Sequence, residues 1–332
     1  MMSMPSITQK ELSYLIDAGK KGDIGAGEYI SKFENAWATY NKRQFGVACN
    51  SGTNALFLAL KALGIGKGDE VLVPEFTMTA TAWAVTYTGA TPIFIDCRDD
   101  LNIDESLIEE AISPKTKAII PVHIYGRPCD MEAINDLAIQ YKLKVVEDMA
   151  EAHGMQPKGD IACYSFYGNK ILTTGEGGMC LTDDYALAEE MRLLANMYFD
   201  KGRTMIHPKI GHNFRMTNIQ AAIGLAQVER IDEILKKRKK IELWYNKHLP
   251  KELLMPNREV LWMYDIDCGD RQAELKEKVE SRYGFKPMSM QPMYLMPYEH
   301  LNAYKWSKRI IYLPTYTDLK EKDIKQICLA LR

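Results

Sequence analysis

The sequence predicts an α/β protein in which a large domain, built on a mostly parallel sheet, precedes a smaller α+β domain. Strand and helix patterns alternate strictly through roughly the first two thirds of the chain. The predicted strands are nearly continuous apolar runs, as in parallel sheets covered by helices on both faces. A length of 332 residues suffices for two such units. We expect residues 1–235, with an N-terminal helical segment, to form the large domain and residues 236–332 the small one.

The elements of the large domain follow in order. Apolar side chains at helical spacing over residues 28–41, after the turn Gly25-Ala26-Gly27, predict the first helix. Apolar runs predict strands at 45–49, 70–74, 91–95, 118–122, 143–146, 161–167 and 179–181. Helical patterns between and after them cover 54–63, 77–87, 130–141 and 185–197. Residues 198–212 are polar and poorly patterned, and we expect a loop there.

The C-terminal part is patterned less clearly. From Thr217 an alanine- and leucine-rich pattern predicts one long helix to about Lys240, long enough to leave the sheet and reach the second domain. Beyond it we expect strands near 259–265 and 309–313 and helices near 270–282 and 319–331. These short elements are the basis for predicting a small α+β domain.

Charge and composition exclude several classes of function. The net charge of −2 gives no electrostatic reason to expect nucleic acid or an anionic membrane as a partner. The basic run 236–240 continues a helical pattern, which favours a solvated face. Seven scattered cysteines without CxxC or Cys/His spacing indicate reduced thiols and no metal site. No signal-peptide pattern or membrane-length apolar run is present, so we expect a cytoplasmic protein.

Two predicted strands deliver an acid and a lysine to their carboxyl ends. The first ends on Glu147 and Asp148, and the second leads into Gly168-Asn169-Lys170. A lysine amine forms the Schiff base with the aldehyde of pyridoxal phosphate (PLP), and a carboxylate beside the pyridine nitrogen keeps that nitrogen protonated. Taken alone, the aspartate could be a helix cap and the lysine a solvated charge. The pair therefore suggests a PLP site without establishing one.

A small polar turn supplies a third feature. Strand 45–49 runs into Asn50-Ser51-Gly52-Thr53, and a strongly helical pattern follows. Free N–H groups and the positive end of the dipole at a helix N-terminus favour a phosphate, Gly52 lets it come close, and the Ser51 and Thr53 hydroxyls can donate. A plain N-cap without a ligand is the alternative. Because ligands of parallel sheets bind at the carboxyl ends of strands, the turn, Asp148 and Lys170 converge on one predicted site.

The chain resembles the DegT/StrS-type PLP-dependent nucleotide-sugar aminotransferases, of fold type I, over nearly its whole length. The motifs that carry the resemblance are FENAWA at 33–38, SGTNALFLAL at 51–60, GDEVLVP at 68–74, PVHIYG at 121–126, VEDMAEAHG at 146–154, SFYGNK at 165–170, TGEGGM at 174–179 and NFRMTNIQAAIGLAQVERID at 213–232. Their spelling is closest to the perosamine synthase branch, whose substrate is GDP-4-keto-6-deoxymannose.

The resemblance implies roles for residues around the cofactor ring. Lys170 would be the Schiff-base lysine and proton shuttle, and Asp148 would pair with the pyridinium nitrogen. Glu151 would lie against the hydroxyl side of the ring, where the family has glutamine or glutamate. Met78 takes the position of an aromatic residue that stacks on the ring in relatives, and its sulfur can pack on a π face.

Other implied roles concern the phosphate and the assembly. Gly52, Thr53 and Ser165 would hold the phosphate, together with the Ser51 hydroxyl. Asn213 would reach the phosphate of a partner subunit's cofactor, which implies a homodimer with shared sites. Two departures from the family leave the identity of the substrate open: the segment 153–160 is shorter than usual, and Gln291-Pro292-Met293-Tyr294 replaces a histidine-containing segment that lies near the sugar in relatives.

The activity that the resemblance implies is a ping-pong transamination from L-glutamate to the 4-keto carbon of a nucleotide-linked 6-deoxyhexose. Several alternatives remain open at this point. The enzyme could act at C4 or C3 of a UDP- or dTDP-linked keto sugar, or the protein could bind PLP as a non-catalytic regulator. A PLP-dependent 3-dehydratase of the same fold is disfavoured, because those relatives carry histidine where this chain has Lys170.

Overall fold

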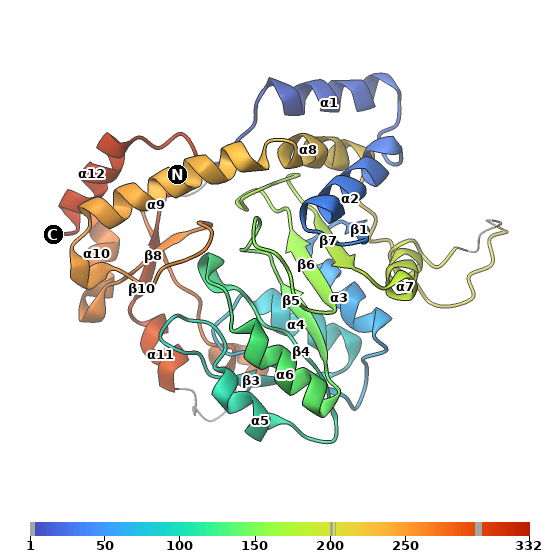
Figure 1. Ribbon diagram of the computed structural model, residues 1–332, viewed down its shortest axis with the longest axis horizontal. Helices are drawn as coiled ribbons and strands as arrows, with labels where there is room; N and C mark the ends of the chain where they lie inside the picture. Colours follow the sequence, from blue (N-terminus) through green and yellow to red (C-terminus); the bar gives the residue numbers. More distant parts are fainter. Residues whose placement is uncertain (1–3, 200–201, 203, 296–300) are drawn as a thin grey trace.

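The computed structural model describes residues 4–199, 202, 204–295 and 301–332. A seven-stranded sheet in the order β1-β7-β6-β5-β4-β2-β3 forms its centre (Figure 1). Strand β7 is antiparallel to both neighbours, and the other pairs are parallel. The prediction of an α/β fold with a mostly parallel sheet is therefore confirmed. The strands are β1 (Phe45–Cys49), β2 (Glu70–Pro74), β3 (Thr91–Ile95), β4 (Thr116–Ile119), β5 (Lys144–Asp148), β6 (Ile161–Ser165) and β7 (Gly178–Thr182).

Helices cover both faces of this sheet because its strands are apolar on both sides. In β6, Ile161 and Cys163 face one apolar core, whereas Ala162 and Tyr164 face the other. The large-domain helices are α1 (Gln9–Lys20), α2 (Glu28–Tyr40), α3 (Gly52–Ala62), α4 (Thr79–Thr88), α5 (Ile108–Ala111), α6 (Met131–Tyr141), α7 (Tyr185–Ala195) and α8 (Asn218–Val228). Helices α3, α4 and α7 share the first core, and α2 and α8 share the second. The carboxyl ends of the parallel strands are left open at one edge.

The C-terminal part forms a separate, smaller sheet. Its order is β8-β10-β9, with both pairs antiparallel. The elements are α9 (Ile231–His248), β8 (Tyr264–Asp267), α10 (Gln272–Lys278), β9 (Arg282–Tyr283), α11 (Leu301–Ser307), β10 (Ile310–Leu313) and α12 (Glu321–Ala330). An apolar core of its own joins α9, α12 and this sheet. The division at residue 235 stays a prediction, since α9 runs through that point.

The prediction of a single helix from 217 to about 240 is wrong. Helix α8 ends at Val228 and α9 begins at Ile231. Between them Arg230 has a non-helical φ of −119°, and its guanidinium forms a buried ion pair with Glu11 of α1. The pattern analysis did not predict α1, which packs along α8 (Figure 1). The break therefore lies where α8 meets a helix that the sequence reading missed.

Among the described residues, none of the helices combines the length and the apolar character needed to cross a membrane.

Candidate active site

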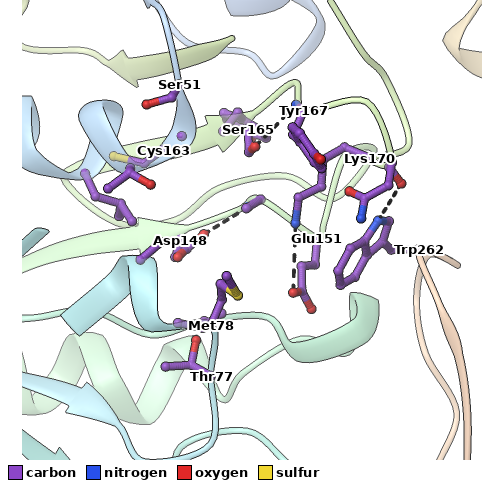
Figure 2. A pocket seen from close by; sticks show the side chains of 18 of the residues that line it. Ser51, Thr77, Met78, Asp148, Glu151, Cys163, Ser165, Tyr167, Lys170 and Trp262 are labelled. Carbon is purple, nitrogen blue, oxygen red and sulfur yellow. Dashed lines mark hydrogen bonds and ion pairs between the residues drawn. The ribbon is translucent and has the colours of Figure 1, made fainter. Parts of the chain in front are cut away.

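A cavity of about 370 Å³ lies at the carboxyl ends of β1, β5 and β6 (Figure 2). Almost all of the predicted site residues line it: Ser51, Gly52, Thr53, Met78, Asp148, Glu151, Ser165 and Lys170. Asn213 is not among the lining residues. It lies on the segment after α7, where it forms a short bridge with Asn196. The structure thus brings together in one chain every predicted residue except Asn213, which was expected to act on a partner.

Lys170 lies in the turn that follows β6, with its amine held between an acid and an indole. Its Nζ is 4.0 Å from Oε1 of Glu151 and 3.9 Å from the ring centroid of Trp262. Burial lowers the pKa of Lys170, and the charges of Glu151 and Asp148 oppose part of that effect. A lowered pKa increases the share of neutral amine, which is the nucleophilic form. Trp262 also donates from Nε1 to the carbonyl of Asn169 at 2.9 Å, which fixes the turn that carries the lysine.

Asp148 is the last residue of β5, and its buried carboxylate is held by two donors. Oδ2 accepts a hydrogen bond from Oγ1 of Thr81 at 2.9 Å, and Oδ1 accepts one from the Ala150 N–H at 3.1 Å. Burial raises the pKa of Asp148, whereas these two hydrogen bonds and the Lys170 charge counteract the rise. A buried carboxylate that faces a cavity is best stabilised by a cationic partner, such as a protonated ring nitrogen.

Glu151 is positioned by a tight turn in the backbone. Its Oε2 accepts the N–H of Tyr125 at 2.8 Å. Tyr125 adopts the left-handed conformation with φ 52°, which is unusual for an aromatic residue and is a form of strain found at functional sites. Burial raises the pKa of Glu151 to about 7, and the Lys170 charge opposes this rise. A carboxyl group of this kind can change protonation state near neutral pH.

The opposite end of the cavity is formed by the start of α3. Ser51 is the N-cap, and its Oγ accepts the N–H of Asn54 at 3.2 Å. A side chain on Gly52 would place its Cβ 2.6 Å from Cβ of Ser165, so glycine is required for the close approach of α3 to β6. The start of this helix of 11 residues therefore lies against Ser165, and Gly52, Thr53 and Ser165 all line the cavity. Such an arrangement suits a phosphate.

Met78 precedes α4 and lies along one side of the cavity. Its side chain is 51% exposed, and Tyr167, another lining residue, is 49% exposed. The cavity therefore has two accessible, polarisable side chains that an aromatic ring can contact.

The small domain supplies a wall of the cavity that the sequence analysis did not predict. Its lining residues are Trp262, Arg282, Phe285 and Tyr312. Thr81, the partner of Asp148, was also missed. Trp262 stands in the apolar run Val260–Tyr264, which by pattern alone indicates only a core segment. The other residues have no sequence signal without the tertiary structure.

The lysine, the buried carboxylate and the helix N-terminus fit PLP by their chemistry. The amine matches an aldehyde, the carboxylate a pyridinium nitrogen, and the free N–H groups a phosphate. Comparison with known proteins agrees, because the DegT/DnrJ/EryC1/StrS aminotransferase family matches residues 5–332. The chain belongs to this family. The predictions of fold type I and of a PLP-dependent aminotransferase are thereby confirmed.

Individual DegT/DnrJ/EryC1/StrS family members are also similar over their full length. The GDP-perosamine synthase of Caulobacter vibrioides is 41% identical, over 99% of this chain and 96% of the relative. The GDP-perosamine synthase of Escherichia coli O157:H7 is 40% identical, over 98% and 96%. Among solved structures, the PLP form of the sugar aminotransferase Spr1654 from Streptococcus pneumoniae superimposes with a TM-score of 0.92 at 26% identity, covering 100% of this chain and 98% of that one. The residue roles stay predictions.

Proposed function

We propose that this enzyme transfers the amino group of L-glutamate to the 4-keto carbon of GDP-4-keto-6-deoxymannose, giving GDP-perosamine and 2-oxoglutarate. The observation that supports the substrate best is the 41% identity to a GDP-perosamine synthase over 99% of the chain. A lysine at the base of the cavity supports transamination, since the 3-dehydratase alternative requires histidine there.

PLP, when bound, supplies an electron sink that makes the proton beside the amine nitrogen labile. Lys170 would hold the cofactor through its amine and, once released, would take up and return that proton. Asp148, fixed by Thr81, would keep the ring nitrogen protonated. Glu151 would face the hydroxyl side of the ring.

The remaining residues would bind and orient. Ser51, Gly52, Thr53 and Ser165 would hold the phosphate at the N-terminus of α3, and Met78 would pack on the ring. These roles are consistent with the position of each residue in the cavity lining.

The assembly and location belong to the same proposal. Asn213 lies outside the cavity of its own chain, and we expect it to reach the cofactor phosphate of a second copy in a homodimer with shared sites. We expect the enzyme in the cytoplasm, because all seven cysteines are buried free thiols, as is usual in a reducing compartment.

Isotope transfer tests this function. Holoenzyme is incubated with ¹⁵N-labelled L-glutamate and GDP-4-keto-6-deoxymannose, and the product is analysed by mass spectrometry and NMR. The expected product carries ¹⁵N on C4 of the sugar, with one equivalent of 2-oxoglutarate. Formation of 2-oxoglutarate without an aminated GDP sugar would instead favour a UDP- or dTDP-linked substrate, which Gln291 and Tyr294 would then help to select. A protein that takes nitrogen from no donor would be a PLP-binding regulator.

A further inference from the structure

The cavity contains an excess of acidic over basic side chains, although both proposed substrates are anions. Its acidic lining residues are Asp148, Glu151 and Glu176, whereas its basic ones are Lys170 and Arg282. Lys170 is already placed between Glu151 and Trp262. The small-domain residue Arg282 is therefore the cation left to meet an anionic group of a substrate.

Arg282 is held at the wall of the cavity by the small sheet. It lies on β9 directly opposite Tyr312 on β10, and both side chains line the cavity. Burial raises the pKa of the Tyr312 hydroxyl, and Arg282 partly offsets that rise through its charge and a hydrogen bond. Within the described residues, no carboxylate lies at ion-pair distance from the Arg282 guanidinium. The guanidinium is thus oriented by Tyr312 and remains available for an anion.

A short series of contacts connects this wall with the reacting lysine. The Tyr312 ring lies 5.9 Å from that of Tyr125. The N–H of Tyr125 donates to Glu151, whose other oxygen is 4.0 Å from Nζ of Lys170. Arg282 is the cross-strand neighbour of Tyr312, so these contacts link it to the lysine, and its own side chain is exposed to solvent.

We propose that Arg282, oriented by Tyr312, binds a carboxylate of the amino donor and so determines donor specificity; this rests on the proposed function. The planar guanidinium of arginine matches a carboxylate with two parallel hydrogen bonds. The donor is small and carries a carboxylate on the reacting carbon. In the nucleotide sugar, by contrast, the sugar ring separates the diphosphate from the reacting carbon. Because Arg282 lines the same cavity as Lys170, it can bind the carboxylate of a donor whose amine is at the lysine.

The donor half-reaction alone tests the inference. Holoenzyme is mixed rapidly with L-glutamate or L-alanine, without any sugar, and the absorbance change and the 2-oxo acid formed are followed. We expect Arg282→Gln to lower the second-order rate constant for the reaction with glutamate about 10²-fold. Arg282→Lys keeps the charge but loses the planar guanidinium that forms two parallel hydrogen bonds, and it should lower the rate constant about tenfold. The matched control is Arg271→Gln, which alters an exposed arginine of the same domain that pairs with Glu274 outside the cavity. It should change the rate less than about twofold.

Comparing L-glutamate with L-alanine shows which carboxylate of the donor Arg282 binds. An equal loss with alanine and glutamate assigns Arg282 to the carboxylate next to the amine, and a loss with glutamate alone assigns it to the distal one. Either result supports the proposal. Rates within about twofold of wild type for both donors overturn it.

Calorimetric binding of GDP gives a readout independent of turnover. We expect Arg282→Gln to leave the GDP affinity within about threefold of wild type. A tenfold weaker GDP affinity with unchanged donor rates would assign Arg282 to the diphosphate and overturn the donor assignment. A wild-type enzyme that reacts with glutamate but not with the GDP sugar would refute the proposed substrate and leave this inference standing. A wild type that reacts with neither donor would refute both.

Discussion

Replacing Glu151 with glutamine isolates the energetic cost of a buried acid beside Lys170. Glutamine keeps an acceptor for the N–H of Tyr125 but carries no charge. Burial raises the pKa of Glu151 from 4.5 to about 7 in the folded protein. A carboxyl group whose pKa is raised by folding costs no stability at a pH where it is protonated in both the folded and the unfolded state. As the pH rises above 4.5, the unfolded chain ionises first, so the folded state loses stability until about pH 7 and the cost is constant above that.

The size of the effect follows from that shift. A rise of the pKa from 4.5 to about 7 corresponds to roughly 3 kcal/mol at pH 8, because a tenfold change in an equilibrium constant is about 1.4 kcal/mol. Lys170 lies 4.0 Å away and loses its counter-charge in the variant, which offsets part of the gain. We therefore expect Glu151→Gln to raise the free energy of unfolding of the cofactor-free protein by about 2–3 kcal/mol at pH 8. At pH 5 we expect a gain below about 1 kcal/mol.

Urea unfolding of the cofactor-free protein at pH 5 and pH 8, followed by circular dichroism, measures both values. Glu176→Gln is the matched control, since Glu176 also lines the cavity but is exposed. We expect it to change the free energy of unfolding by less than about 0.5 kcal/mol at both pH values. A gain for Glu151→Gln that is no larger at pH 8 than at pH 5 would show that Glu151 ionises without penalty, and the burial argument would be wrong.

Three further substitutions test other parts of the site. Lys170→Ala should reduce 2-oxoglutarate formation more than about 10³-fold with little change in thermal stability, and retained turnover would contradict its role. Thr81→Val removes a donor to Asp148 and should weaken PLP binding about tenfold in equilibrium dialysis, whereas unchanged affinity would mean that this hydrogen bond is not needed. Gly126→Ala would bring a Cβ into the carbonyl oxygen of Val260, at a backbone φ of +80°. It should lower the free energy of unfolding by about 3 kcal/mol or more, and a cost below about 1 kcal/mol would contradict the close packing of Gly126 against Val260.

Much of the large domain was predictable because its strands are buried on both faces. The runs 45–49, 70–74 and 91–95 coincide with β1, β2 and β3. Helix α1 could have been found from Thr8 and Glu11, whose side chains form a capping box. The break between α8 and α9 could not, because it coincides with a tertiary contact, the ion pair of Arg230 with that helix. Helical periodicity does not detect such a tertiary contact.

In the site, the residues at the ends of strands could be predicted from the sequence, whereas the residues that hold them in position could not. Of the neighbouring acids Glu147 and Asp148, the alternation of the strand allows only one to face the cavity. Glu147 is buried with His123, and it accepts the backbone N–H groups of Lys158 and Gly159. Glu147, which has no predicted catalytic role, thus holds the short segment after His153 in place through these hydrogen bonds. Arg282 is brought to the cavity only by the pairing of β9 with β10, so no local pattern could reveal it.

The contribution of the small domain to the cavity has a consequence for biosynthesis. A ribosome completes Asp148 and Lys170 well before it adds Trp262 and Tyr312, because translation proceeds from the N-terminus. Until Trp262 docks on the turn after β6, the lysine amine lacks the indole that covers it. The complete pocket therefore exists only after the small-domain residues that line it have been synthesised. We expect stable cofactor loading to follow the folding of the small domain, and chains that stop before Trp262 to present an uncovered amine to cellular aldehydes.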